Sequence, residues 1–356
     1  MASVTVISGV GDKLPAAFLV ENHGYRLLLD LGEGPQSGVR PDIAAIGRVD
    51  AICLTHSHGD HIGSLQAREE MGNPPVYATK QTWQHIPEAW VNVRDRYVLP
   101  LKGHVSVGPL PLLCGRSGHA PGAVWFHLPD SGGLTYMGDW SRESLLLPFD
   151  PPPAADLLIT DASYGDRTEP LSEQIEQIAS AVKGGAVLPV PVNGKGPEMA
   201  LRLMARGIKV LLCPEIRKEV ASLLSEPNSI CSRLQLQLLE VLHHQPEQPD
   251  YTQGQVIIAT DAIADSGLAA QLSRRTGFRF IFSSHMAAGT RAREMLEAGQ
   301  ARSIPWNVHP PLNDQLELIR STRARQVIAA FTPASDVQQL TARSSAPLNW
   351  AREIAF

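Results

Sequence analysis

The sequence predicts an α/β protein in which a small parallel-sheet domain is inserted into a larger β-rich domain. The first 165 residues show short apolar runs separated by turns, which is the pattern of strands. From about residue 167 to residue 300, helical and strand patterns alternate, as they do in parallel sheets. Short strand patterns then return. A chain of 356 residues also exceeds what one hydrophobic core usually supports.

In the β-rich part, several predicted strands end at acidic residues. The predicted strands are residues 4–7, 16–20, 25–29, 51–54, 123–128, 134–137 and 157–160. Asp30 follows the third of them, and Asp139 and Asp161 follow the last two. The fourth leads directly into a group of histidines. Because rigid scaffolds often carry functional groups on the loops after strands, these positions are candidates for a site.

Beyond Gly165 the apolar spacing becomes helical, and Gly184-Gly185 ends the first helical segment. One β-α-β unit follows: strand 186–192, a glycine-rich turn, helix 197–205 and strand 209–213. The block continues with helices to about residue 244, strand 255–260, helix 268–276 and strand 278–282. After the block we predict a helix at 312–322 and a strand at 326–332. We therefore expect a first domain at 1–166, an insert at 167–300, and a return to the first domain at 301–356.

The composition predicts a soluble, cytoplasmic protein: 43% of the residues are hydrophobic, 19% are charged, and we find neither a signal peptide nor a membrane-spanning run. The four cysteines are Cys53, Cys114, Cys213 and Cys231. Their scattered spacing argues against a disulfide framework and against a thiolate zinc site. The net charge of −5 counts mildly against tight nucleic-acid binding, although a local basic groove remains compatible with it.

The run Thr55-His56-Ser57-His58-Gly59-Asp60-His61 has the highest density of potential metal ligands in the chain. An extended backbone would point His56 and His58 to the same side. Zinc binds imidazole nitrogen and carboxylate oxygen, and a catalytic zinc site keeps one position for water. The alternative is a surface loop with adventitious histidines. The preceding apolar strand favours the metal site.

Two later residues are further candidates for metal ligands because of the turns and strands next to them in the sequence. His119 lies in the turn Gly118-His119-Ala120-Pro121-Gly122, just before a predicted strand. Asp139 lies in Gly138-Asp139-Trp140, just after one, where a carboxylate could bridge two metal ions. Each residue alone would more often be structural. The histidine run makes a role as metal ligand the better interpretation of both.

Taken together, the H-x-H-x-D-H run, the later Gly-His and the Gly-Asp after a strand resemble the metallo-β-lactamase superfamily, and Asp30 matches its first motif. The stretches 136–142 (YMGDWSR) and 160–166 (TDASYGD) resemble its β-CASP branch, and stretches 188–195 and 282–285 with 289–290 echo it. That branch contains the cleavage-and-polyadenylation endonuclease, RNase J and Artemis-type DNA nucleases, and its members carry an α/β insert at this point. The resemblance implies an αββα sandwich with an inserted α/β (β-CASP) domain.

The resemblance also implies roles for individual residues. His56, His58 and His119 would hold a first zinc ion, Asp60 and His61 a second, and Asp139 would bridge them. Asp161 matches the motif A acid and His309 the motif B histidine, which the family pairs near the scissile phosphate. The structural alternatives are a strand-end cap for Asp161 and a turn residue for His309.

One position departs from the family pattern. The motif C histidine is expected near Phe331, and no histidine follows His309 in the chain. RNA-processing members usually supply a ligand for the second zinc there, whereas Artemis-like DNA nucleases lack it. The number of metal ions therefore stays open between one and two, and the choice of RNA is weakened. Manganese is an alternative ion.

The insert contributes candidate contacts to substrate. His285 stands where the family often has an aromatic residue, and it is either a rim group that contacts phosphate or a strand-end histidine. Arg142, Lys195 and Arg291 are candidates for contacts to a nucleic-acid backbone.

From these features we predict a zinc-dependent nuclease that cleaves phosphodiester bonds of RNA or DNA, acting on a single strand. Asp60 would orient the attacking hydroxide or accept its proton, and His309, held by Asp161, would protonate the leaving oxygen. A small-molecule esterase, thioesterase or lactonase of the same fold is the first alternative. A non-catalytic scaffold is the second, and metal analysis would distinguish it. RNA versus DNA, endo- versus exonuclease and the oligomeric state stay open.

Overall fold

The computed structural model describes residues 2–34, 38–226, 228–247 and 249–356. The chain divides into two compact units. The first contains the residues up to Arg142, Pro148–Thr168 and His309–Phe356, and the second contains Glu143–Leu147 and Glu169–Val308. The backbone therefore passes between the units four times, after residues 142, 147, 168 and 308. Each unit is described by itself.

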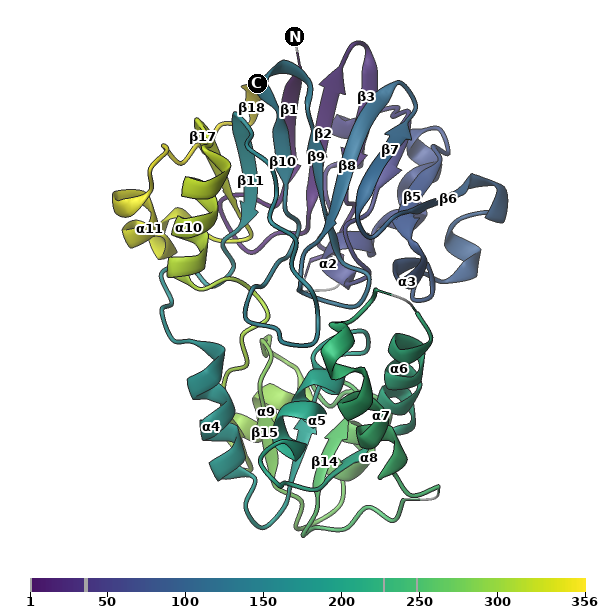
Figure 1. The fold of residues 1–356 in the computed structure, drawn as a ribbon, viewed down its shortest axis with the longest axis vertical. Helices are drawn as coiled ribbons and strands as arrows, with labels where there is room; N and C mark the ends of the chain where they lie inside the picture. Colours follow the sequence, from purple (N-terminus) through teal and green to yellow (C-terminus); the bar gives the residue numbers. More distant parts are fainter. Residues whose placement is uncertain (1, 35–37, 227, 248) are drawn as a thin grey trace. The chain divides into compact units, whose positions relative to one another are not determined.

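The first unit contains two sheets that face each other (Figure 1). The seven-stranded sheet has the order β18-β1-β2-β3-β4-β5-β6. Its strands are β1 (Ser3–Ser8), β2 (Ala17–Asn22), β3 (Tyr25–Leu29), β4 (Ala51–Cys53), β5 (Val76–Thr79), β6 (Arg96–Leu99) and β18 (Glu353–Ala355). The six-stranded sheet has the order β17-β11-β10-β9-β8-β7. Its strands are β7 (Gly103–Val107), β8 (Leu110–Arg116), β9 (Val124–Leu128), β10 (Leu134–Tyr136), β11 (Leu157–Asp161) and β17 (Gln326–Ala330).

Three buried clusters form the layers of this unit. The first cluster joins side chains of both sheets, for example Phe18 with Phe126. A second packs the outer face of the seven-stranded sheet against α1 (Ile43–Ile46), α2 (Gly59–Ile62) and the 3₁₀ helix Leu65–Met71. A third packs the six-stranded sheet against α10 (Leu312–Thr322) and α11 (Gln338–Arg343). The structure therefore confirms the predicted αββα sandwich.

Helix α3 (Lys80–Trp83) follows β5, and the remaining 3₁₀ segments of the chain are short: Glu88–Trp90, Val93–Asp95, Asp130–Gly132, Ser232–Leu234 and Ala334–Asp336. Among the described helices, none combines the length and the apolar character that a bilayer crossing requires.

The direction of the strands brings polar residues together. In the first sheet, β3 and β4 are parallel, and Asp30 and Thr55 follow their carboxyl ends. In the second, β10, β11 and β17 are parallel. Asp139 and Phe331 follow two of these strands, and Asp161 ends the third. Because carboxyl ends of parallel strands meet at one edge of a sheet, each sheet presents its polar residues at one edge.

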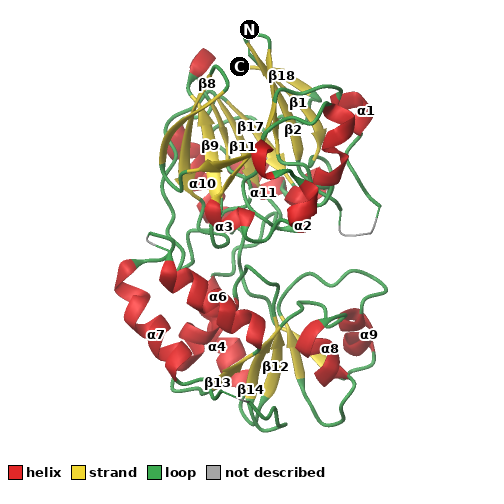
Figure 2. Cartoon of the chain, turned by 90° about the vertical axis from the view of Figure 1, so that its right-hand side faces the viewer, coloured by secondary structure: helices red, strands yellow, loops and turns green. Residues whose placement is uncertain are grey.

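The second unit is a five-stranded parallel sheet in the order β13-β14-β12-β15-β16. The strands are β12 (Ala186–Pro189), β13 (Val210–Leu212), β14 (Val256–Ala259), β15 (Phe280–Phe282) and β16 (Ala301–Ser303). The helices are α4 (Leu171–Ala181), α5 (Gly196–Met204), α6 (Pro214–Ser225), α7 (Gln235–His243), α8 (Gly267–Ser273) and α9 (Arg291–Glu297). Figure 2 shows α6 and α7 on one side of the sheet and α8 and α9 on the other. One continuous buried cluster fills the unit. Because β16 pairs with β15, the unit extends beyond residue 300, the limit expected from the sequence.

Candidate metal centre

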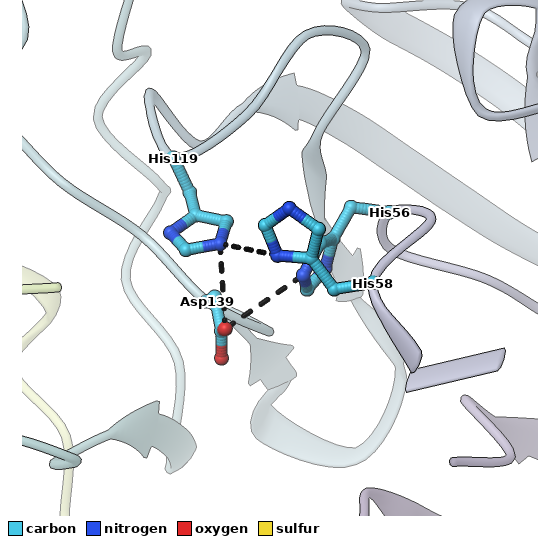
Figure 3. A group of neighbouring side chains, drawn as sticks. All are labelled: His56, His58, His119 and Asp139. Carbon is cyan, nitrogen blue, oxygen red and sulfur yellow. Dashed lines mark hydrogen bonds and ion pairs between the residues drawn. The ribbon is translucent and has the colours of Figure 1, made fainter. Parts of the chain in front are cut away.

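Four side chains of the first unit converge in one cluster. They are His56, His58, His119 and Asp139, and each offers a ligand atom within 4.8 Å of those of the others. Figure 3 shows the rings of His58 and His119 meeting nearly at right angles, with the carboxylate of Asp139 beside them. His119 Nε2 lies 3.0 Å from His58 Nδ1 and 3.5 Å from Asp139 Oδ2, and His56 Nε2 lies 3.7 Å from the same oxygen. This arrangement directs three imidazoles and one carboxylate at a common point.

Asp139 also belongs to two neighbouring groups. One combines it with Asp60 and His61, and the other with Asp161 and His309. Asp139 Oδ1 is 3.2 Å from His61 Nε2, and Asp139 Oδ2 is 3.7 Å from His309 Nδ1. The structure therefore brings together all eight residues that the sequence assigned to metal binding and catalysis, with Asp139 at the centre of the group.

Backbone geometry after two strands allows this approach. Gly118 precedes His119 with φ +72°, and a Cβ at this glycine would lie 2.2 Å from the carbonyl oxygen of Ser141. Gly138 precedes Asp139 with φ +53°, and a Cβ there would lie 2.7 Å from the side chain of Thr55. Both glycines adopt a conformation that other residues rarely take, and both leave no room for a side chain. The turns that carry His119 and Asp139 therefore depend on them.

Asp30 fixes the orientation of His61. Its carboxylate accepts hydrogen bonds from the amide and the hydroxyl of Thr55, both at 2.7 Å, and from the hydroxyl of Tyr136 at 2.6 Å. Asp30 Oδ2 also lies 2.7 Å from His61 Nδ1, so this nitrogen carries the proton and Nε2 faces the cluster. Carboxylates in this position hold ligand histidines in one tautomer in many metal sites. Thr55 Oγ1 contacts His56 Nδ1 at 3.1 Å, which leaves Nε2 of His56 facing Asp139.

Burial and neighbouring charges set the protonation of the cluster. Burial, reinforced by the imidazoles of His61 and His58, lowers the pKa of His56 well below its usual value, so its ring is neutral. Burial alone would lower the pKa of His61, but the carboxylates of Asp139 and Asp30 raise it well above normal. Burial would raise the pKa of Asp60, yet His61 and His58 lower it. The centre therefore combines the neutral imidazole of His56 with the ionised carboxylate of Asp60, and a metal ion bound at Nε2 of His61 would have to displace a proton.

Among the described residues, three buried polar atoms of the cluster lack hydrogen-bond partners, as expected for atoms that bind a metal ion. His56 Nε2, His61 Nε2 and Asp139 Oδ1 have no hydrogen-bond partner of acceptable geometry in the described part of the chain. The last two face each other at 3.2 Å without forming such a bond. Buried polar atoms are nearly always satisfied, and imidazole nitrogen and carboxylate oxygen are ligands for divalent metals. The donor set fits a metal ion.

Asp161 and His309 form a close pair at the edge of the cluster. Asp161 Oδ2 lies 2.7 Å from His309 Nδ1, and Asp161 Oδ1 accepts the amide of Ser163 at 2.8 Å. Burial would lower the pKa of His309, but the carboxylates of Asp161 and Asp139 raise it. The ring of Tyr164 meets the ring of His309 edge to face, with 4.9 Å between the ring centroids. His309 is therefore oriented from two sides.

The candidate substrate contacts lie outside this cluster. Arg142 belongs to the first unit and pairs with Glu317 at 3.0 Å. Lys195, His285 and Arg291 belong to the second unit. Lys195 is buried, its Nζ donates to the carbonyl of Ser283 at 2.7 Å, and burial lowers its pKa to about 7. Arg291 pairs with Glu294 at 3.4 Å, and His285 is exposed after β15.

Sequence reasoning missed the contacts that depend on packing between the sheets. Asp30 was matched to a motif, but its hydrogen bond to Tyr136 joins residues that are 106 positions apart. Tyr136 lies within a predicted strand, and nothing in the sequence around it indicated a hydrogen bond to Asp30. Phe331 packs against the ring of His61 at 5.2 Å and supplies no ligand atom.

A domain of the metallo-beta-lactamase superfamily is present in the chain, because residues 10–176 match that family. The family match and the cluster together support a metal-dependent hydrolase. Ribonuclease TTHA0252 of Thermus thermophilus is 32% identical over 49% of this chain and 48% of its own length. Transcription termination factor FttA of Methanosarcina mazei is 23% identical over 95% of this chain and 63% of its own length.

Other similar proteins cover less of the sequence or share only the fold. A ribonuclease Z of Alkaliphilus oremlandii is 39% identical over 20% of this chain and 25% of its own length. A crystal structure of a protein of unknown function from Enterococcus faecalis covers all of this chain with a TM-score of 0.58 and 14% identity, which shows the fold alone. The chain spans about half to two thirds of the length of the first two relatives.

Proposed function

We propose that this protein is a metal-dependent nuclease of the β-CASP branch, which hydrolyses phosphodiester bonds in a single strand of nucleic acid. The observation that carries the proposal is the Asp161–His309 pair, at 2.7 Å, beside a cluster of metal-binding side chains. A hydrolase that acted through its metal ligands alone would not need a second, oriented acid. The two relatives named as a ribonuclease and as a termination factor support a nucleic-acid substrate.

The residues divide into two sets of ligands that share Asp139. His56, His58 and His119 would hold a first zinc ion with Asp139, and Asp60 and His61 would hold a second ion with the other oxygen of Asp139. When bound, a divalent ion lowers the pKa of water and offsets the charge that develops on phosphoryl oxygens. The first set has four protein ligands and the second has three, so we propose that the first ion binds more tightly. Manganese is an alternative ion for either position.

The chain's own residues would move the protons. Asp60 lies among the ligands with a lowered pKa, so it is ionised and can accept a proton from the attacking water. As the new bond to phosphorus forms, the bond to the leaving oxygen breaks. His309 would donate a proton to that oxygen, because Asp161 and Asp139 raise its pKa against the effect of burial and so favour its protonated form. Asp161 holds Nδ1 of His309, which leaves Nε2 for the substrate.

RNA is the substrate that we propose first, because two of the named relatives are ribonucleases. The insert that follows Thr168 would be the β-CASP domain of the branch. The alternative within the same fold is a small-molecule esterase, thioesterase or lactonase.

The test compares purified wild type with His309→Ala and Asp60→Asn on labelled RNA and DNA of one sequence, after loading with zinc or manganese. We expect cleavage by wild type and losses of about 10²- to 10⁴-fold in kcat for His309→Ala, the usual contribution of a general acid. Metal analysis accompanies each variant, because His309→Ala should retain the first ion. If wild type that contains metal cuts neither nucleic acid but hydrolyses a chromogenic ester, the nuclease proposal is wrong.

A further inference from the structure

The candidate centre has many acidic groups and few cations. Four carboxylates lie in or beside the cluster: Asp30, Asp60, Asp139 and Asp161. A nucleic-acid strand carries one negative charge per phosphate, and proteins that hold such strands use lysine and arginine along the backbone. Metal ions neutralise the scissile phosphate, but the phosphates on either side of it need other partners. Two cationic side chains of the first unit border the cluster, and they are Lys13 and Arg167.

Lys13 lies on the loop between β1 and β2, and both ends of this loop are tied to the centre. The carbonyl of Gly9 accepts the amide of Phe331 at 2.7 Å, and the amide of Ala16 donates to the carbonyl of Asp60 at 2.8 Å. The side chain of Lys13 is exposed, and within the described residues it has no ion pair. The loop that carries Lys13 is therefore held at both ends beside the centre, next to Phe331 and next to Asp60.

Arg167 borders the side of the centre that holds His309. Its guanidinium lies over the ring of Tyr164, 4.1 Å from the centroid, and Tyr164 contacts His309 edge to face. The backbone of Arg167 is fixed, because its amide donates to Tyr164 and its carbonyl accepts the amide of Leu312 at 2.8 Å. The neighbouring carboxylate of Asp166 caps α11, where it accepts the amides of Gln339 and Leu340 at 2.7 and 2.9 Å.

From this geometry we infer that Lys13 and Arg167 are substrate-binding residues that hold the phosphates flanking the scissile bond. The inference rests on the proposed nuclease function, and it adds how the strand is held across the centre. Lys13 would act as a mobile point charge. Arg167 is half-buried and positioned by Tyr164, and it would bind a phosphate with the fixed geometry of its guanidinium. Neither residue would move a proton or hold a metal ion.

The test measures cleavage and binding of a short, fluorescein-labelled single-stranded RNA, with single-stranded DNA of the same sequence beside it. The variants are Lys13→Ala, Lys13→Arg, Arg167→Ala and Arg167→Lys. Arg94→Ala is the matched control, because Arg94 is 84% exposed on the same unit and pairs only loosely with Asp95 at 3.7 Å. Metal content is measured for every variant, so that loss of an ion is separated from loss of a phosphate contact.

We expect Lys13→Ala and Arg167→Ala each to raise KM several-fold, with kcat changed by less than about threefold and metal content unchanged. The slope of log affinity against log salt should become shallower by about 0.7 for each lost contact to a single strand. Lys13→Arg should restore the affinity, whereas Arg167→Lys should restore it only in part because lysine lacks the planar fork.

Two outcomes separate this inference from the proposed function. If wild type cleaves the RNA but Lys13→Ala and Arg167→Ala behave like Arg94→Ala in KM and in salt slope, the inference is wrong and the nuclease proposal stands. If wild type cleaves nothing, fluorescence anisotropy of the same oligonucleotide still reports on both residues. An unchanged salt slope in those binding measurements would overturn the inference on its own.

Discussion

Phe331 determines which ligands surround the second candidate metal position. The residue follows β17 with φ +65°, its amide donates to Gly9, and its ring packs 5.2 Å from the ring of His61. A positive φ is uncommon for a bulky residue, so the surrounding packing must hold it there. Because a phenyl ring offers no ligand atom, the ligand candidates that converge on this position in the described part of the chain are Asp60, His61 and Asp139.

We predict that Phe331→His strengthens binding of a second metal ion. Histidine tolerates a positive φ better than most residues and would place a ligand beside His61. Even contacts that act indirectly on a metal change its affinity by about 10- to 100-fold, so a new ligand should produce at least the lower figure. Metal analysis and competition with a chelator measure the effect. Phe331→Leu is the control, and equal stoichiometry and affinity in both variants would contradict the prediction.

Among the elements, α6 stabilises the turn between β12 and α5 through a buried acid. Glu219 of α6 accepts the amides of Asn193 and Gly194 at 3.2 and 3.0 Å. Burial nevertheless raises the pKa of Glu219 to about 8. Between about pH 4.3, the pKa of an unfolded glutamate, and about pH 8, the folded state therefore binds more protons than the unfolded state. The free energy of unfolding must then fall as pH rises through this window.

We predict that Glu219→Gln flattens this pH dependence. The difference in slope between wild type and variant isolates Glu219, and the pKa change limits the effect to at most about 5 kcal/mol. Urea unfolding between about pH 5 and about pH 8 measures it. Glu176→Gln is the control, because Glu176 is exposed and pairs with Arg206. Parallel pH profiles for wild type and Glu219→Gln would show that the acid is not protonated in the folded state.

The sequence predicted elements well where burial imposes a clear pattern. Residues 25–29 and 312–322 were expected as a strand and a helix, and both have these bounds in the structure. Strands β6 and β7 were missed because they lie at sheet edges with exposed residues and weak alternation. The strand expected at 186–192 ends at Pro189, since prolines at 189 and 191 lack the amide that a longer ladder needs.

The same contrast holds for the candidate site. The ligand-like spacing of residues 56–61, the turn and strand-end positions of His119 and Asp139, and the family resemblance for Asp161 and His309 led to eight residues that the structure brings together. The sequence around Lys13 and Arg167 contains no recognisable motif. Their positions beside the cluster depend on the hydrogen bonds of the loop that carries Lys13 and on the packing of Arg167 over Tyr164. Local sequence does not encode those contacts.

At the scale of the whole molecule, the two units have separate hydrophobic cores. The buried cluster of the second unit contains none of the residues that form the three clusters of the first. Every candidate metal ligand belongs to the first unit. A ligand that binds only the folded state stabilises the unit that holds it. Metal should therefore act on one unit and not on the other.

We predict two unfolding transitions on heating, of which metal raises only the one that belongs to the first unit. At a free metal concentration of 100 times Kd the stabilisation is about 2.7 kcal/mol. Calorimetry with and without a chelator measures the shift, and hydrogen exchange in β11 and β12 assigns each transition. His119→Ala should abolish the metal effect. A single transition that moves as a whole would contradict the separation of the cores.

The four passages of the backbone between the units also set an order of events during synthesis. Most of the second unit is one continuous segment, Glu169–Val308, which is synthesised before His309 and leaves the ribosome ahead of it. The first unit must wait, because β1 pairs with β18 and β11 pairs with β17. The insert can therefore fold while its host is still open at both sheets. Among the eight residues of the candidate site, His309 is synthesised last. The nascent chain therefore contains all the proposed metal ligands before it contains the proposed general acid.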